Sequence, residues 1–138
     1  MKIYVLFYLA TGIVFLGCDA VWLSVTGSGL YRPLLGDLLL EKFRLIPAVA
    51  FYLIYIGGIV VFAISPAVVS GRWSTALIRG ALFGFVAYAT YDLTNQATLR
   101  SWSTTITILD LSWGTTLTAV SATLGYLITG AIARATSG

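Results

Sequence analysis

The chain contains 138 residues, of which 59% are hydrophobic and only 9% are charged. A soluble domain has about a quarter of its residues charged, so this chain cannot cover itself with polar surface in water, and we expect it in a bilayer. The net charge of +3 is spread along the sequence without a basic run, which argues against nucleic-acid binding. Histidine is absent and Cys18 is the only cysteine, which excludes a disulfide framework, a zinc or haem site and a thiol–histidine pair.

Residues 3–25 form the first predicted span, because the run matches the roughly 20 apolar residues that cross a bilayer core. Asp19 and Trp22 lie toward its far end. The Leu-Gly-Cys sequence that ends at Cys18 resembles a lipoprotein cleavage site, but it lacks the small residue needed just before the glycine. We therefore expect the segment to be retained as a membrane span.

The connection to the second span, residues 26–46, is the longest in the chain. Its glycines break the first helix, and Pro33 can open a new one. From residue 30 to residue 45, leucine side chains and Phe43 are interleaved with charged side chains. This pattern predicts an amphipathic helix that lies in the membrane interface and acts as a lid or rim.

Three further spans are predicted, at residues 46–66, 76–99 and 104–131. In the third span, a small-xxx-small pair shares one helical face with aromatic and polar side chains: Gly80, Gly84, Tyr88, Asp92 and Asn95. In the fourth, small and polar residues recur at spacings of three and four: Asp110, Gly114, Thr118, Ser121 and Gly125. We expect the two faces to pack against each other.

Three aspartates are expected at one depth of the bilayer. With four spans, the ends of the first and third helices and the starts of the second and fourth lie on one side. At about 1.5 Å per residue, Asp19, Asp92 and Asp110 each lie roughly 9 to 14 Å below that surface. Tyr52 and Tyr55 fall at a similar depth. We therefore predict that the three carboxyl groups approach one another within one shared cavity.

A carboxylate at membrane depth costs on the order of 3 kcal/mol even on insertion scales, which favours a functional interpretation. The candidate catalytic residues are Asp92, Asp110 and Asp19. The candidate ligand-binding residues are Asn95, Trp22, Trp113, Tyr52, Tyr55, Tyr88, Tyr91, Arg32 and Arg100. Three acids this close cannot all be ionised unless one of the two arginines reaches them or a cation sits there.

A structural interpretation of the same residues also stands. Protonated Asp92 and Asp110 and the amide of Asn95 could simply hydrogen-bond across helices, and each such contact stabilises the fold by roughly 0.6 to 2 kcal/mol. Trp22 and Trp113 each follow an aspartate by three residues, so they either line the pocket or anchor the helices at the interface. Carboxylates alone would suit Mg²⁺, Ca²⁺ or Mn²⁺, but no further ligand set is evident, and we expect neither a metal nor a cofactor.

The third and fourth predicted spans carry the runs GALFGFVAYATYDLTNQATLR and ITILDLSWGTTLTAVSATLGY. Together with FLGCDAVWLSV and FYLIYIGGIVVFAISPA earlier in the chain, they resemble a family of small bacterial four-span membrane proteins, domain of unknown function 2177. The resemblance implies that these residues are motif positions: Asp19, Trp22, Tyr31, Arg32, Tyr52, Tyr55, Tyr91, Asp92, Asn95, Arg100, Asp110 and Trp113. It implies no established activity, but family members look to be encoded beside lipid-modifying enzymes, which favours membrane lipids.

The sequence thus predicts one all-α transmembrane domain over residues 1–138, a four-helix bundle with an interfacial helix between the first two spans. We expect it to bind or modify a lipid or lipophilic molecule in an acidic, aromatic pocket within one leaflet. The alternatives are a small proton- or cation-coupled transporter and a structural partner of a membrane lipid enzyme. No nucleophile–base pair or redox motif is recognisable, so the sequence does not decide whether the protein is an enzyme.

The basic residues are balanced between the two sides of the predicted bundle. The amino terminus and the short loop from Arg72 to Arg79 favour a cytoplasmic location for both chain ends. We therefore predict a multi-pass protein of the bacterial inner membrane, with its acids toward the outer side. Its expected partners are membrane lipids, a lipophilic small molecule, a second copy of the chain or another membrane protein.

Overall fold

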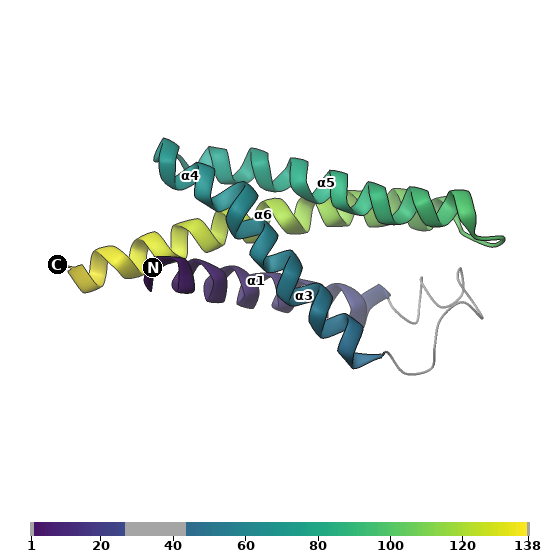
Figure 1. Ribbon diagram of the computed structural model, residues 1–138, viewed down its shortest axis with the longest axis horizontal. Helices are drawn as coiled ribbons and strands as arrows, with labels where there is room; N and C mark the ends of the chain where they lie inside the picture. Colours follow the sequence, from purple (N-terminus) through teal and green to yellow (C-terminus); the bar gives the residue numbers. More distant parts are fainter. Residues whose placement is uncertain (1, 27–43, 138) are drawn as a thin grey trace.

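The computed structural model describes residues 2–26 and 44–137, and these residues form a helical bundle (Figure 1). The helices are α1 (Lys2–Thr26), α3 (Leu45–Ile59), η3 (Val60–Ile64), α4 (Ser65–Ser70), α5 (Trp73–Thr98) and α6 (Thr104–Ser137). The prediction of an all-α membrane bundle is confirmed. The predicted interfacial helix, apart from its last two positions, lies outside the described residues.

Three helical stretches are long and apolar enough to cross a membrane: Lys2–Thr26, Leu45–Ser70 and Thr104–Thr136. Helix α5 contains 26 residues, so its length also suffices. Helix α5 does not count among the three apolar stretches because its composition is more polar, with Arg79, Asp92 and Asn95 within the helix. Helix α5 instead packs antiparallel to α6, its main neighbour (Figure 1).

A π-helical turn, Val60–Ile64, interrupts the second apolar stretch just before Pro66. A proline has no backbone N–H, and its ring clashes with the carbonyl group four residues earlier in an α-helix. The wider turn, in which the Ser65 N–H bonds to the Val60 carbonyl oxygen, makes room for that ring. The helix therefore continues past residue 66, where the sequence analysis ends the span, and stops before Gly71, whose φ of 70° is left-handed.

Small residues bring the backbones of α5 and α6 close together, as their spacing predicts. A Cβ atom added at Gly84 would collide with the Gly114 carbonyl oxygen and lie 2.7 Å from the Thr118 Cβ. A Cβ atom added at Gly80 would lie 2.9 Å from the Ala122 Cβ. The two helices can therefore approach this closely only because both positions lack a side chain.

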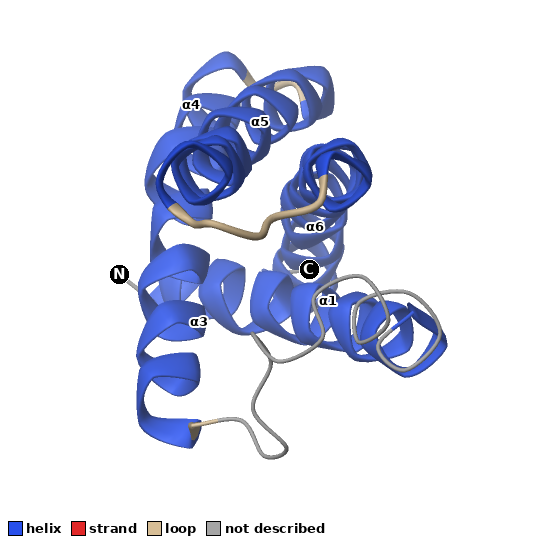
Figure 2. Cartoon of the chain, turned by 90° about the vertical axis from the view of Figure 1, so that its right-hand side faces the viewer, coloured by secondary structure: helices blue, strands red, loops and turns tan. Residues whose placement is uncertain are grey.

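Helix α6 is the central element, since it packs against both α5 and α1 (Figures 1 and 2). Gly125 is predicted to face α5, but Thr11 of α1 occupies the space beside it. The neighbouring rings of Phe7 and Tyr126 stack with centroids 6.3 Å apart. The difference arises because α5 and α6 diverge toward the C-terminal end of α6, so that α1 takes over the contact.

Candidate functional site

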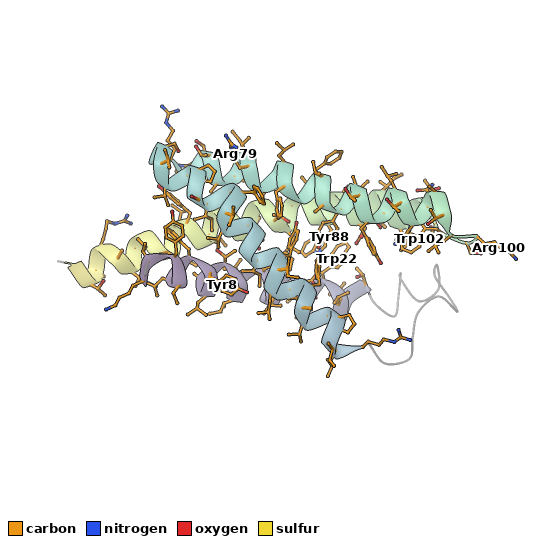
Figure 3. The ribbon with its side chains drawn as sticks, in the orientation of Figure 1. Tyr8, Trp22, Arg79, Tyr88, Arg100 and Trp102 are labelled. Atoms are coloured by element: carbon orange, nitrogen blue, oxygen red, sulfur yellow. The ribbon has the colours of Figure 1, made fainter. Side chains whose placement is uncertain are left out.

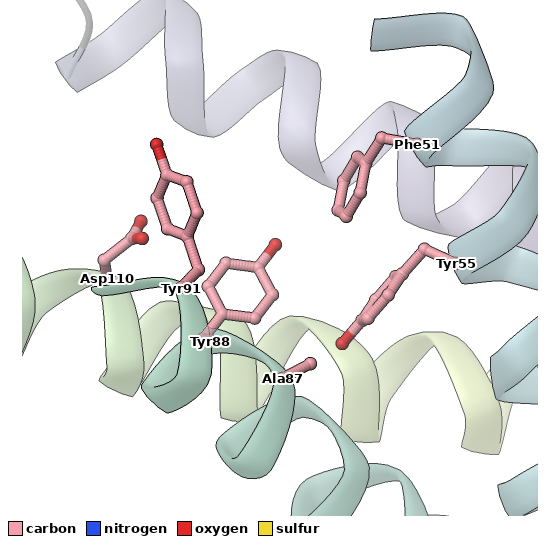
Figure 4. A pocket seen from close by; sticks show the side chains of 6 residues that line it. All are labelled: Phe51, Tyr55, Ala87, Tyr88, Tyr91 and Asp110. Atoms are coloured by element: carbon pink, nitrogen blue, oxygen red, sulfur yellow. The ribbon is translucent and has the colours of Figure 1, made fainter. Parts of the chain in front are cut away.

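A pocket of about 420 Å³ lies between α3, α5 and α6. It is lined by Phe51, Tyr55, Ala87, Tyr88, Tyr91 and Asp110 (Figure 4). Four of these six side chains are aromatic, and one is a carboxyl group. Tyr91 near the end of α5 and Asp110 near the start of α6 place the pocket toward the connection of these two helices, residues 99–103. Its size falls within the range of about 300–1,000 Å³ that is usual for small-molecule sites.

The α5 wall of the pocket continues the small-residue face of that helix. Tyr88 follows Gly84 by four residues, so its side chain lies on the same face, one turn further on. Its ring covers Gly114 of α6, where a Cβ atom would collide with the ring carbons. Ala87 and Tyr91 flank Tyr88 along this wall. The close approach of α5 and α6 therefore fixes where the Tyr88 ring can lie.

The α3 wall is fixed to the other two helices by Tyr55. Its hydroxyl group and the Thr118 hydroxyl group of α6 are hydrogen-bonded at 2.8 Å. Its ring stacks on Phe83 of α5, with centroids 5.1 Å apart, and meets Tyr88 edge-on at 6.1 Å. Phe51, one turn earlier on α3, stacks on the Tyr55 ring at 5.3 Å. The apolar side of the pocket is therefore a connected set of rings.

Asp110 links the pocket to a second, hidden acid. Asp92 of α5 is fully buried, and neither of its carboxyl oxygens accepts a hydrogen bond from a hydroxyl or N–H group within the described part of the chain. The carboxyl groups of Asp92 and Asp110 interact across the α5–α6 interface. Burying a carboxyl group without hydrogen-bond donors costs free energy. The pair therefore favours a shared proton or a positive charge supplied from the pocket.

Asp19 of α1 belongs to a neighbouring polar network. Its carboxylate accepts a hydrogen bond of 2.5 Å from the Tyr52 hydroxyl and one of 3.4 Å from the Trp113 indole N–H. The Trp113 ring stacks on Trp22 with centroids 4.5 Å apart. Tyr88 lies within electrostatic reach of both Asp19 and Asp110. This network joins α1, α3 and α6 beside the pocket.

The three acids therefore occupy adjoining environments, which differs from the single cavity that the sequence predicts. Asp110 lines the pocket. Close packing of α5 on α6 encloses Asp92, and two hydrogen bonds hold Asp19 in its own network. Within residues 2–26 and 44–137, no group of three or more His, Cys, Asp or Glu side chains could hold a metal ion.

The remaining predicted site residues have different positions. Asn95 is half-buried on α5, one turn after Tyr91, and interacts with it. Arg100 is exposed in the α5–α6 connection and its side chain points away from the bundle, so it does not reach the acids (Figure 3). Arg32 lies outside the described residues.

Two lining residues, Phe51 and Ala87, are not predicted from the sequence. Phe51 precedes Tyr55 by four residues, and this helical spacing could have indicated a shared face. Ala87 carries no such signal, because it contributes to the pocket by leaving space free.

The family model described as "Predicted membrane protein (DUF2177)" matches residues 4–127. This range includes every residue that lines the pocket, together with Asp19 and Asp92. No curated protein and no solved structure matches the chain. The match confirms the resemblance seen in the sequence, and the chain belongs to the DUF2177 family of predicted membrane proteins.

Proposed function

We propose that this membrane protein binds a lipid or another lipophilic small molecule in the pocket between α3, α5 and α6. The observation that carries the proposal is the lining of the pocket, in which four aromatic rings and one alanine surround a single carboxyl group, that of Asp110. Ligand sites are mostly apolar, with a few polar groups that orient the bound molecule. Asp110 is the orienting group, and it is also the group that could exchange a proton with the ligand.

Access from the bilayer supports a lipophilic ligand. Phe51 and Tyr91, which stand on opposite walls, have 47% and 59% of their surface exposed. The exposed sides of the helices carry large apolar side chains, among them Ile54 and Leu93 next to these walls. Such a surface is suited to lipid chains, so a ligand dissolved in the membrane can reach the pocket without crossing water.

The arrangement in the membrane is part of the proposal. We take α5 as a fourth span, since 26 residues at about 1.5 Å per residue extend about 39 Å. An even number of crossings agrees with the position of the N- and C-terminal ends at the same end of the bundle (Figure 1). With both ends in the cytoplasm of a bacterial cell, the pocket lies in the outer leaflet of the inner membrane.

A second candidate function is a small proton- or cation-coupled carrier. Three buried hydroxyl groups, those of Thr11, Ser121 and Thr129, have no hydrogen-bond partner within the described residues. Thr11 lies beside Gly125, one turn from both α6 hydroxyls, in the half of the bundle away from the pocket. A polar path through this interface would extend from the acids toward the other side. A carrier predicts that Thr11→Val abolishes uptake into vesicles but leaves ligand retention intact.

Native mass spectrometry with lipid extraction tests the proposed binding. Ala87→Phe fills the pocket, whereas Ala97→Phe adds the same ring at an exposed position of the same helix. We expect a specific lipid or lipophilic compound on the wild type and on Ala97→Phe, and its loss from folded Ala87→Phe. If all three proteins retain the same mixture of lipids and melt alike, the pocket holds no ligand, and a structural role beside another membrane protein becomes the better account.

A further inference from the structure

The chemistry of the pocket wall suits a positively charged head group. The faces of aromatic rings carry partial negative charge and attract ammonium groups, and cages of such rings recognise quaternary ammonium ions. Here the rings of Phe51, Tyr55, Tyr88 and Tyr91 surround the pocket together with the carboxyl group of Asp110. A carboxylate beside aromatic faces attracts the same kind of group through its full charge.

The charged side chains around the pocket also favour a positively charged head group. Every basic side chain that the structure describes is exposed, and none lines the pocket: Lys2, Arg44, Arg72, Arg79, Arg100 and Arg134. Behind Asp110 lies the buried carboxyl group of Asp92, which interacts with Asp110 and accepts no hydrogen bond from a hydroxyl or N–H group among the described residues. An anionic head group would meet one acid in the lining, Asp110, and no basic side chain, with the carboxyl group of Asp92 buried behind it. A cationic head group would supply the counter-charge that this carboxyl pair favours.

The two ends of the pocket differ in polarity. Asp110 lies at one end beside the rings of Tyr91 and Tyr88, and Phe51 lies toward the other end with Tyr55 (Figure 4). The hydroxyl of Tyr55 is already bonded to Thr118, so its ring offers the pocket an apolar surface. An elongated ligand would therefore place its polar head at Asp110 and its apolar part against Phe51 and Tyr55.

We propose that the pocket takes an amphiphile with an ammonium head group, which Asp110 binds directly while the rings of Tyr88 and Tyr91 flank it. This inference rests on the proposed function and names the chemical class of its ligand. The ammonium group could belong to an ethanolamine or choline phospholipid, or to a free long-chain amine. Asp92 does not contact the ligand in this account and acts as a positioning residue that favours positive charge at Asp110.

The experiment uses the full chain, purified in an uncharged maltoside detergent. Tetradecyltrimethylammonium and the uncharged, chain-matched tetradecanoyl monoglyceride are titrated separately, and binding is followed by native mass spectrometry. We expect the wild type and Ala97→Phe to bind the ammonium probe about tenfold or more tightly than the uncharged probe, through charge attraction and cation–π contacts. Asp110→Asn should bring the two affinities close together, and Ala87→Phe should bind neither probe.

A second variant keeps the test decisive if Asp110→Asn does not fold. Tyr91 is 59% exposed, so Tyr91→Leu preserves the apolar surface and removes one ring face. We expect it to weaken the ammonium probe by about threefold or more and to leave the uncharged probe unchanged. Equal weakening of both probes would contradict the role assigned to the ring.

The failures of the two proposals can be told apart. If the wild type binds both probes equally well and Asp110→Asn changes neither affinity, the ammonium inference is overturned and the lipophilic pocket stands. If the affinity of the wild type for each probe is no higher than that of Ala87→Phe, the proposed function is overturned as well.

A lipid arm identifies the source of the ammonium group. The wild type and Asp110→Asn are placed in nanodiscs of equal parts phosphatidylethanolamine and phosphatidylglycerol, and the lipids retained after release are counted. Enrichment of phosphatidylethanolamine by the wild type alone assigns the ammonium group to a phospholipid. Equal retention of both lipids, with the alkylammonium preference intact, assigns it to a free amine, whereas enrichment of phosphatidylglycerol would overturn the inference.

Discussion

At the scale of single residues, Asp19 and Asp92 show how differently two membrane carboxyl groups can be held. Asp19 accepts hydrogen bonds from Tyr52 and Trp113, so its polar atoms are paired within the bundle. Asp92 is completely buried, faces the carboxyl group of Asp110, and accepts no hydrogen bond from a hydroxyl or N–H group within the described residues. A carboxylate that accepts hydrogen bonds from donor groups contributes to the fold, whereas a buried one that faces only a second acid costs stability and persists where it serves a function. We therefore propose a structural role for Asp19 and a place in the binding site for the Asp92–Asp110 pair.

This assignment predicts the effect of removing one hydroxyl group. Tyr52→Phe deletes the shorter of the two hydrogen bonds to Asp19 and should lower the free energy of unfolding by about 1–3 kcal/mol, because the partly buried carboxylate then keeps only the Trp113 donor. Tyr126→Phe is the control, since it removes a tyrosine hydroxyl on α6 and keeps the ring that stacks on Phe7. Thermal unfolding in detergent measures both changes. Equal melting temperatures for the two variants would contradict a structural role for Asp19.

At the scale of elements, the contact between α5 and α6 sets the geometry of the pocket. Gly84 permits the close approach of α5 to α6. Because the helices are this close, the ring of Tyr88 on α5 packs directly on Gly114 of α6. The same contact places Asp92 opposite Asp110. Movement of α5 away from α6 would therefore change both the pocket wall and the acid pair.

Two glycine substitutions test this contact. Gly84→Ala would place its Cβ against the Gly114 carbonyl oxygen, which belongs to the backbone and cannot turn aside. We expect a loss of roughly 1–3 kcal/mol in the free energy of unfolding, the usual cost of overpacking. Gly17→Ala on α1 meets nothing within 4 Å and should instead stabilise the helix by about 0.5–1 kcal/mol. We expect the melting temperature to fall for Gly84→Ala and to rise for Gly17→Ala, and a rise for both variants would show that α5 and α6 are less closely packed.

Much of this element-level arrangement could be predicted from the sequence. Asp92 and Asp110 each lie nine residues from Ser101, so an antiparallel pair of helices must bring them level. The repeated small residues at spacings of three and four predict which faces meet. Two features could not be predicted in this way. Gly125 packs against α1 because the helices diverge, and the pocket exists because Ala87 leaves space, and neither depends on local sequence pattern.

At the scale of the whole molecule, the number of crossings decides where the pocket lies. Three helical stretches have the length and composition of membrane spans, and α5 is the fourth that we propose. If α5 crosses the membrane, Ser70 before it and Ser101 after it lie on opposite sides. Both residues are exposed in the structure, which makes them suitable positions for labelling.

Cysteine labelling in intact cells tests this topology. In a Cys18→Ser background, Ser101→Cys should react with a membrane-impermeant maleimide from outside, and Ser70→Cys should react only after the cells are opened. Reaction of both positions from the same side would mean that α5 does not cross. Reaction of Ser70→Cys alone from outside would keep four spans but reverse the orientation and place the pocket in the inner leaflet.

The most direct test of the central claim, that the pocket holds a lipophilic molecule, is photo-crosslinking in native membranes. A photoreactive phenylalanine analogue replaces Phe51, which lines the pocket, or Phe85, which has similar exposure (47% and 51%) but does not line it. We predict one dominant small-molecule adduct at position 51, lost when Ala87→Phe fills the pocket, and a mixture of bulk lipids at position 85. The same mixture at both positions, unaffected by Ala87→Phe, would contradict the claim.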